Sequence, residues 1–463
     1  MIRNCALLVA GAIIACSPNA VAEASHAPTS GESGVPSLVD DLRALLTAAR
    51  GAPELVCSLA SDAIGQGGWY GNSFNAPHTP LPRVEIAGRR HRDSDDAGEE
   101  SATAADIDML ISNVSSDDRC VRAISVRVLG RVGGESATRG LSSLLGNTDA
   151  SIRETAALGL GLIEPKTATV SILSALRDPV AGVRANAAWA LGRIDDGRAL
   201  RPLIETLLDA DSTVRLAAVS AIGQLDSASA IPALLRVLRE DRVASVRRVA
   251  AWALGDLEAV TAVRDLVTVM ERDADAGVRE MCAWALGNID AQAGVDGLKI
   301  SAQRDSDARV RESAVWALGE IGEKGAADAL GEVLARDTVR AVRGTAAWAL
   351  GNIDATRAPQ GLILALGDAD DEVRLKAAWA MGEIKDRDAV PALRTAMKRE
   401  RNEKIRRAQL RALIETGERS ESMLTELLDS SDPEVREAAV RGLAGRNVMN
   451  PWPWPQPRPR PFP

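Results

Sequence analysis

Apolar residues recur at three- and four-residue spacing over most of the chain, which is the period of an amphipathic helix. The stretch 198–223 shows the pattern clearly. One predicted helical face there is formed by Leu200, Leu203, Ile204, Leu207 and Leu208. The polar stretch 209–212 interrupts the pattern, and a second apolar run follows over 214–222. The pattern therefore predicts two short helices joined by a turn.

A longer repeat lies over this helical pattern. The phrase Val-Arg, then Ala-Ala-Trp-Ala-Leu-Gly, then a polar residue and Ile, returns in varied form every 30 to 32 residues. Its Arg stands at Arg122, Arg153, Arg184, Arg215, Arg247, Arg279, Arg311, Arg343, Arg374, Arg406 and Arg436. Eight residues later stands Gly130, Gly161, Gly192, Gly223, Gly255, Gly287, Gly319, Gly351 or Gly382, and the last two units lack this glycine. This period predicts about eleven structural repeats.

Each repeat is predicted to be a pair of helices. Pro202 suits the first turn of the first helix, where its missing N–H costs nothing. Gly223 is expected to end the second helix in the left-handed conformation. Two such helices cannot bury their apolar faces alone, so the repeats must stack. The predicted fold is all-α, an α-solenoid of about eleven two-helix repeats over residues 105–446.

An acidic residue stands six positions before most of the repeat arginines. The pairs are Asp178 and Arg184, Asp209 and Arg215, Asp241 and Arg247, Asp273 and Arg279, Asp305 and Arg311, Asp337 and Arg343, and Asp368 and Arg374, with Glu400 before Arg406. These groups are expected to hydrogen-bond within and between repeats, which makes a charge ladder along the solenoid. Because each acid has an Arg partner and the acids are about 31 residues apart, the ladder is interpreted as structural rather than as a metal site.

The Val-Arg…Ala-Ala-x-Ala-Leu-Gly-x-Ile phrase and the six-residue spacing from Asp to Arg resemble the HEAT repeat family, specifically its short subtype named after phycobilisome lyases. The resemblance covers about residues 106–446. The resemblance implies an α-solenoid and a bacterial, exported protein. Fold alone does not imply function.

Tryptophan occupies one position of the repeat, five residues after the Arg. The six residues are Trp189, Trp252, Trp284, Trp316, Trp348 and Trp379. In the family this position borders the concave surface, so the resemblance implies a Trp stripe there that binds a partner. Nearby variable positions would give the groove an acidic character; they include Glu280, Met281, Glu312, Lys376, Asp256, Glu320 and Glu383. The alternative is that the rings pack only against the adjoining helix.

The N-terminus reads as an export signal over residues 1–22, with an apolar core at 5–16 and the A-x-A site Ala20-Val21-Ala22. A lipid on Cys16 is the rival interpretation, because Ile13-Ile14-Ala15-Cys16 resembles a lipobox. Cys57, Cys120 and Cys282 would remain after cleavage. Cys282 stands where other repeats carry Ala and is interpreted as buried and free. Cys57 and Cys120 are then a candidate disulfide, with two separate buried thiols as the alternative.

Three further segments flank the repeats. Residues 23–66 are predicted to hold a helical hairpin that caps the solenoid, and residues 67–104 to be a disordered linker. Residues 447–463 form a tail in which every second residue from Pro451 is Pro, a pattern typical of an extended polyproline rod. The rod could dock in a groove or serve as a stiff spacer.

Composition narrows the function classes. The net charge of −9 argues against nucleic acid as a partner. His26, His78 and His91 are the only histidines, and none is followed by Glu, which excludes the histidine-ligated iron site of hydroxylase relatives. An export signal conflicts with bilin lyase activity inside the cell. No catalytic residue, cofactor or metal is predicted.

The sequence therefore favours a non-catalytic extracytoplasmic scaffold or adaptor, periplasmic, secreted or lipid-anchored, that binds a protein or peptide on the concave surface. A glycan-binding envelope protein that uses the Trp stripe is the alternative, because Trp rings also stack on sugars. A lyase- or hydroxylase-like enzyme, by analogy with relatives of the same fold, is the third class.

Overall fold

The computed structural model describes residues 38–53, 57 and 102–417, together with residues 428, 433, 436, 437 and 440. The predicted export signal, most of the predicted linker 67–104 and the Pro-rich tail lie outside these residues, as does most of the predicted N-terminal hairpin. All regular secondary structure in the described part is helical, which agrees with the predicted all-α solenoid. Its contacts divide the chain into two units, 1–227 and 228–463.

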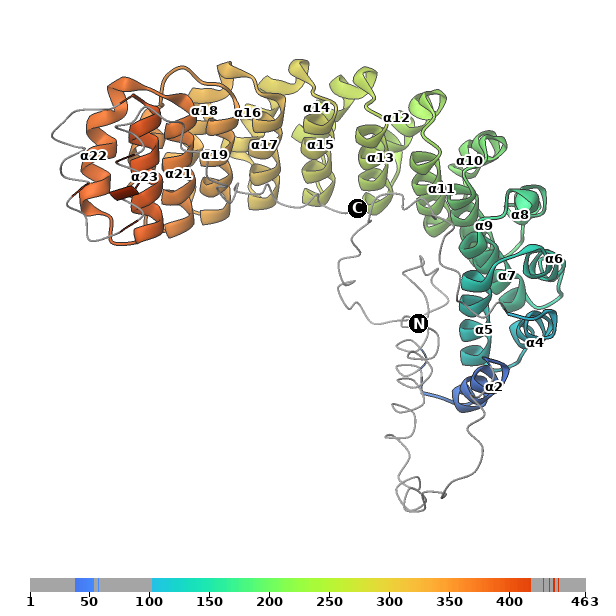
Figure 1. Cartoon of the computed structure of the whole chain (residues 1–463). Helices are drawn as coiled ribbons and strands as arrows, with labels where there is room; N and C mark the ends of the chain where they lie inside the picture. Colours follow the sequence, from blue (N-terminus) through green and yellow to red (C-terminus); the bar gives the residue numbers. More distant parts are fainter. Residues whose placement is uncertain are drawn as a thin grey trace, which may run out of the picture. The chain divides into compact units, whose positions relative to one another are not determined.

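The first unit consists of short helices in two layers (Figure 1). Its helices are α2 (Leu38–Ala49), α4 (Ala104–Val114), α5 (Arg119–Val132), α6 (Glu135–Leu144), α7 (Ala150–Ile163), α8 (Thr169–Ala175), α9 (Ala181–Ile194), α10 (Leu200–Thr206) and α11 (Ser212–Gln224), with 3₁₀ turns η2 (Lys166–Ala168) and η3 (Gly197–Ala199). We call the first helix of each repeat the A helix and the second the B helix. The B helices α5, α7, α9 and α11 pack in sequence against one another.

The second unit continues the same scheme. Its helices are α12 (Ile231–Glu240), α13 (Ala244–Asp256), α14 (Val263–Arg272), α15 (Ala276–Asn288), α16 (Val295–Arg304), α17 (Ala308–Ile321), α18 (Ala327–Arg336), α19 (Arg340–Asn352), α20 (Gln360–Ala365), α21 (Asp371–Ile384), α22 (Val390–Arg399) and α23 (Glu403–Glu415). The 3₁₀ turns η4 (Ala228–Ala230), η5 (Val260–Ala262), η6 (Gln292–Gly294), η7 (Lys324–Ala326) and η8 (Arg387–Ala389) precede A helices. The B helices α13, α15, α17, α19, α21 and α23 lie side by side in one layer (Figure 1).

The A helices from α10 to α22 each place a fully buried leucine at one position of the core between the two layers, and α8 places Ile172 in the core. In successive repeats the leucine is Leu203, Leu234, Leu266, Leu298, Leu330, Leu362 and Leu393, each 0% exposed. Burying a leucine side chain contributes about 1.5–3 kcal/mol. The three- and four-residue apolar spacing of the sequence therefore marks the face on which each A helix packs.

The B helices end in a residue with left-handed backbone geometry, but this residue is not the repeat glycine. Asp226, three residues beyond Gly223, has φ 46°, whereas Gly223 lies inside α11. The equivalent residues are Glu164, Asp195, Glu258, Asp290, Gly322, Asp354 and Lys385, all with positive φ. The prediction that Gly223 ends its helix in the left-handed conformation was therefore wrong.

The repeat glycine instead permits a close approach of the next B helix. A methyl group added to Gly255 would lie 2.8 Å from Cζ3 of Trp284 and 2.9 Å from Cα of Ala285. The same addition at Gly287 would lie 2.9 Å from Cζ3 of Trp316. Real Cβ atoms do not tolerate such distances, so only glycine lets the Trp and Ala of the following repeat pack this closely.

A disulfide joins the N-terminal segment to the first repeat. Cys57 is bonded to Cys120 at the start of α5, with a Cα–Cα distance of 5.4 Å. The backbone N–H of Gly51 also donates to Asp118 Oδ2 at 2.8 Å. Cys282 on α15 is free and buried, and burial raises the pKa of its thiol well above the ordinary value.

Candidate functional site

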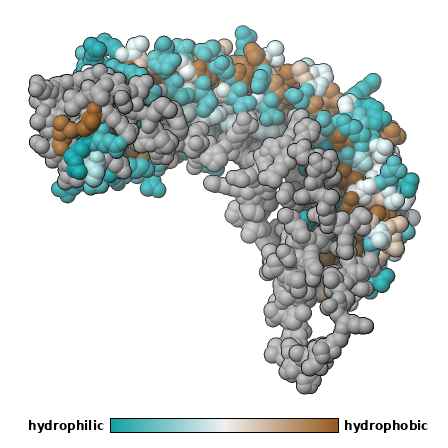
Figure 2. All heavy atoms as spheres, viewed as in Figure 1, coloured by the Kyte–Doolittle hydropathy of each residue, from teal (hydrophilic) through white to brown (hydrophobic). Residues whose placement is uncertain are grey.

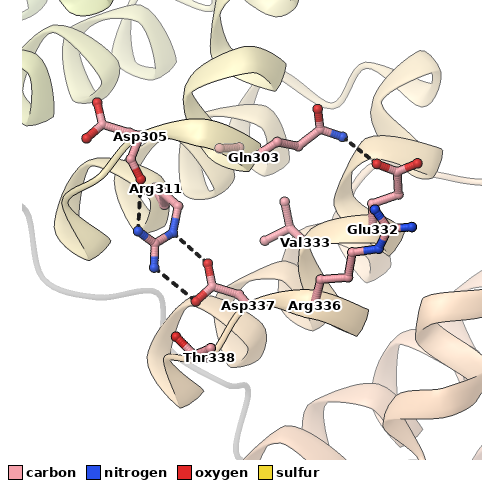
Figure 3. A pocket seen from close by; sticks show the side chains of 9 residues that line it. Gln303, Asp305, Arg311, Glu332, Val333, Arg336, Asp337 and Thr338 are labelled. Carbon is pink, nitrogen blue, oxygen red and sulfur yellow. Dashed lines mark hydrogen bonds and ion pairs between the residues drawn. The ribbon is translucent and has the colours of Figure 1, made fainter.

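Most of the repeat arginines form a ladder in which the Arg side chain binds the acid of the following repeat. In Figure 3, Arg311 donates from Nε and Nη2 to the two oxygens of Asp337, at 2.6 and 3.1 Å. Its Nη1 donates to the backbone carbonyl of Asp305 at 2.9 Å, the acid of its own repeat. The same bond joins Arg153–Asp178, Arg184–Asp209, Arg247–Asp273, Arg279–Asp305, Arg343–Asp368 and Arg374–Glu400, with Nε–O distances of 2.6–2.8 Å.

The same acids also order the turn before each B helix. Asp305 Oδ1 accepts the backbone N–H of Asp307 at 2.9 Å, and Asp307 in turn caps α17. The hydrogen bond from Arg153 lowers the pKa of Asp178. Burial raises the pKa of Asp273, but the hydrogen bonds from Arg247 and from the N–H of Asp275 outweigh it, and the net pKa is lowered. The ladder carboxylates are thus occupied in joining repeats, which fits a structural role.

The six tryptophans predicted to bind a partner lie mostly between B helices. Trp284 is 1% exposed, and Trp189, Trp348 and Trp379 are 7–8% exposed. Trp252 and Trp316 are half-buried. The ring edges of Trp284, Trp316 and Trp348 lie against the glycine of the preceding repeat, at Gly255, Gly287 and Gly319. These contacts account for packing, and partner binding through the rings stays a prediction.

A pocket of about 260 Å³ opens on the B-helix layer of the second unit, between α17, α19 and α21. Trp348 and Val373 supply apolar wall, and Glu312, Thr345 and Lys376 supply polar groups. Arg340, Asp370 and Glu372 also line it. Carboxylates thus outnumber cations by three to two around the pocket.

A glycine keeps this pocket open. Gly344 stands one residue after the repeat Arg, where the neighbouring repeats carry Glu312 and Leu375. A methyl group at Gly344 would meet only Lys376 and Val373, at ordinary distances of 3.5 Å and more. Glycine inside a helix costs about 1 kcal/mol relative to alanine. Packing does not require this glycine, and a larger side chain here would occupy the pocket.

Two ion pairs and the buried Glu312 line the pocket. Lys376 Nζ lies 2.9 Å from Glu372, and Arg340 lies 3.6 Å from Asp370, which also caps α21. Glu312 is 7% exposed and accepts a long hydrogen bond of 3.4 Å from Thr345 Oγ1. A buried carboxylate is stable only when positive charge or hydrogen-bond donors compensate it. The pocket therefore places a buried carboxyl group beside an apolar wall.

The sequence predicted the acidic character of this region but not the pocket. Glu312 and Lys376 belong to the variable positions beside the Trp, and the structure brings them together with Gly344 from three helices. The signal that could have revealed the pocket is Gly344 itself, a helix-interior glycine outside the repeat's glycine position. Among the described residues no group of three or more His, Cys, Asp or Glu could hold a metal ion.

Other surface features are less localised. Large exposed apolar residues include Val170, Val180, Leu208, Val260, Ile300 and Leu364. In the view of Figure 2 hydrophobic residues are interspersed among hydrophilic ones. No helix in the described part of the chain is long and apolar enough to cross a bilayer.

Comparison with known proteins yields a family match. A family model described as HEAT repeats matches residues 107–182, 169–255, 238–318, 263–351, 295–370 and 358–444. No curated protein matches the chain. Together the family matches extend over more than half of the sequence.

Several solved structures match this chain to different degrees. An engineered protein is 23% identical, with 73% of this chain and 98% of that chain covered and a TM-score of 0.42. YibA of Escherichia coli is 22% identical, with 54% and 97% covered and a TM-score of 0.42. Kap95p, in a structure in which its binding induces the switch loops of RanGDP to adopt the GTP-bound conformation, is 16% identical, with 73% and 56% covered and a TM-score of 0.51. The last likeness shows a shared fold alone.

Proposed function

Because the chain belongs to the HEAT-repeat family, whose solenoids commonly serve as protein-interaction scaffolds, we propose that it is a non-catalytic scaffold or adaptor that binds a protein or peptide on its B helices. The observation that carries the proposal is the pocket on α17, α19 and α21, which Gly344 keeps open although packing does not require a glycine there. A glycine that lowers the stability of its helix, and that packing does not require, is expected where the helix contacts a ligand.

The lining of the pocket supports binding rather than catalysis. It contains a buried carboxylate, a hydroxyl, an ammonium group and an indole, with neither His nor Cys among the lining residues. Stacking on sugars needs an open ring face, and Trp348 is only 8% exposed, so the glycan alternative receives no support from this pocket.

The proposal places the protein outside the cytoplasm. The N-terminal pattern of residues 1–22 supports export, and the disulfide between Cys57 and Cys120 is a bond typical of oxidising compartments. Whether residue Cys16 carries a lipid decides between a soluble and an anchored form. Fractionation of cells that make the protein, followed by mass analysis of its mature N-terminus, tests both points.

Site-specific photo-crosslinking tests the binding surface. A benzophenone amino acid is introduced in the full chain at Thr345, inside the pocket, and at Leu364, which is 59% exposed on an A helix. Adducts to one protein or peptide species are expected from position 345 and not from position 364. The same adducts from both positions, or none from position 345, would contradict the proposal.

A further inference from the structure

We propose that the chain has a second binding surface, on its A helices, for an extended acidic segment of a partner protein. The surface is a row of three arginines, which we call the arginine edge: Arg272, Arg304 and Arg336 are the last residues of α14, α16 and α18. This inference goes beyond the proposed function, because the A helices form the other layer from the B helices that carry the pocket at Gly344.

The three guanidinium groups are available to a ligand. All three residues are exposed to solvent. Within the part of the chain that the structure describes, their side chains have no hydrogen bond and no ion pair. The acids that follow them in the sequence are bound instead by the ladder arginines of the preceding repeats; these acids are Asp273, Asp305 and Asp337. Each arginine of the edge therefore keeps its five N–H donors for a ligand.

The end of a helix does not by itself account for the arginine edge. A cation in the last turn stabilises a helix, because it faces the partial negative charge of the helix C-terminus. The same position of the repeat, however, holds Glu240 before the row and Gly367 after it. The A helices therefore form without an arginine at this position, and three arginines in consecutive repeats are a property of this part of the surface.

The spacing of the arginines indicates the partner. Packed helices lie about 8–10 Å apart, and α14, α16 and α18 pack in sequence against one another. An extended peptide advances about 3.3 Å per residue, so about three of its residues span one repeat. An Asp or Glu at every third position would thus place one carboxylate at each arginine, and the guanidinium fork matches a carboxylate. Duplex DNA carries a charge about every 1.7 Å of its axis, which is far denser than one arginine per repeat.

A pocket of about 270 Å³ lies between α16 and α18, at the arginine edge (Figure 3). Ala302 and Val333 supply its apolar wall, and Arg336 and Thr338 also line it. The hydroxyl group of Thr338 has no hydrogen-bond partner among the described residues. A glutamate of the partner suits this lining, because its aliphatic stem would pack on Val333 while its carboxylate accepts hydrogen bonds from Arg336 and Thr338.

The carboxylates around this pocket leave Arg336 available. Asp305 and Asp337 belong to the ladder and are already bound by arginines. Glu332 accepts a hydrogen bond from Gln303 Nε2 at 3.0 Å. Glu332 also precedes Arg336 by one helical turn, and the two form no ion pair. An incoming carboxylate is therefore attracted by Arg336 and opposed by Glu332, so the two residues should affect binding in opposite directions.

Fluorescence anisotropy with labelled peptides tests this inference. The full chain is titrated into a fluorescein-labelled 12-residue peptide of Ser, Thr and Glu with Glu at positions 3, 6 and 9, and into a peptide of the same composition with its three Glu adjacent. We expect the spaced peptide to bind at least fivefold more tightly than the clustered one. The double variant Arg304→Gln with Arg336→Gln should bind the spaced peptide at least tenfold more weakly, and Glu332→Gln at least twofold more tightly. Arg177→Gln is the matched control and should change nothing, because Arg177 holds the same position of an earlier repeat and Leu208 follows it one repeat later.

Several outcomes would overturn the arginine edge as a binding surface. These are no saturable binding of the spaced peptide, equal affinity for the spaced and clustered peptides, tighter binding of a labelled single-stranded DNA of 12 nucleotides, unchanged affinity of the double variant, and no gain for Glu332→Gln. A role of the arginines in helix stability alone predicts no such gain, and melting curves of each variant ensure that a loss of binding is not a loss of folding. None of these outcomes affects the B-helix pocket, which crosslinking at position 345 tests separately.

Discussion

The indole ring of Trp284 lies against Gly255 of the preceding repeat, so closely that a methyl group on Gly255 would stand 2.8 Å from Cζ3 of the ring. The Trp and the Gly are thus one packing device shared by two repeats. Ala285, next to Trp284, also lies against Gly255. Because Gly255 and Ala285 are both small, the backbones of the two helices can approach closely. This contact explains why the two residue types recur together along the chain.

Replacing Gly255 with Ala should destabilise the protein. Overpacking of a closely packed site costs typically 1–3 kcal/mol, which exceeds the gain of about 1 kcal/mol in helix propensity. Gly344→Ala is the matched control, because a methyl group there meets only ordinary contacts, and it should stabilise by about 0.5–1 kcal/mol. Urea denaturation followed by circular dichroism measures both. Equal shifts of the urea midpoint in the two variants would show that the close approach at Gly255 does not affect the free energy of unfolding.

The ladder should contribute more than an exposed ion pair. Arg311 and Asp337 have side chains 15% and 6% exposed, and the pair is bidentate. Arg311→Met should cost about 3 kcal/mol, because Asp337 loses its charged partner while partly buried. Arg139→Met removes a pair whose side chains are 74% and 91% exposed, and should change stability by less than about 0.5 kcal/mol. Comparable losses for the two variants would contradict a structural ladder.

Stability should fall in acid. The pKa values of Asp178, Asp209, Asp273, Asp305, Asp368 and Glu400 are lowered in the folded protein, below ordinary values of 3.8 for Asp and 4.5 for Glu. A lowered folded pKa gives stability that is present above the unfolded pKa and lost as pH falls through the folded one. Unfolding midpoints should therefore be steady between pH 7 and about 5 and decline below about pH 4.

One carboxyl acts in the opposite direction. Burial raises the pKa of Glu320, with the Trp316 indole offsetting part of the effect, so its contribution declines as pH rises through the raised pKa. The six ladder carboxyls outnumber it, which fixes the sign of the expected acid loss. Asp273→Asn should flatten the decline, and a protein whose stability rises below pH 4 would refute the account of the ladder.

The cysteines should differ in reactivity. The thiol of Cys282 is buried and its pKa is raised, so an alkylating reagent should modify it only after denaturation. Cys57 and Cys120 should appear as one linked peptide without reductant. Their bond closes a separation of 63 residues, for which the chain-entropy relation gives about 4 kcal/mol. Alkylation of Cys57 in unreduced protein, read by peptide mapping, would show the bond to be absent.

Much of the fold could be predicted because each repeat carries its own local rules. Apolar spacing identified the helix faces, and the repeated Arg and Asp indicated contacts within and between repeats. The role of Gly223 was misread, because a glycine near a helix end fits two explanations, a left-handed terminus or a close approach. Only the position of the next helix distinguishes them, and Asp226 takes the left-handed position instead.

The pocket is harder to predict from the sequence, because it depends on the absence of a side chain at Gly344. Glu312, Gly344 and Lys376 are separated by more than 30 residues from one another and meet only when α17, α19 and α21 stack. One repeat alone shows Gly344 merely as a weak helix residue. Comparison between repeats shows that Gly344 replaces the larger residues of its neighbours, and the structure shows that a pocket lies beside it.

The most direct test of the account is the affinity of Gly344→Leu for the partner identified by crosslinking at position 345, measured beside its unfolding midpoint. Leu occupies the equivalent position in the next repeat, as Leu375, so the fold accommodates it there. The account predicts that the variant unfolds at the same or a higher urea concentration than the wild type and binds the partner at least tenfold more weakly. A stable variant that binds the partner as tightly as the wild type would contradict a binding site on α17, α19 and α21.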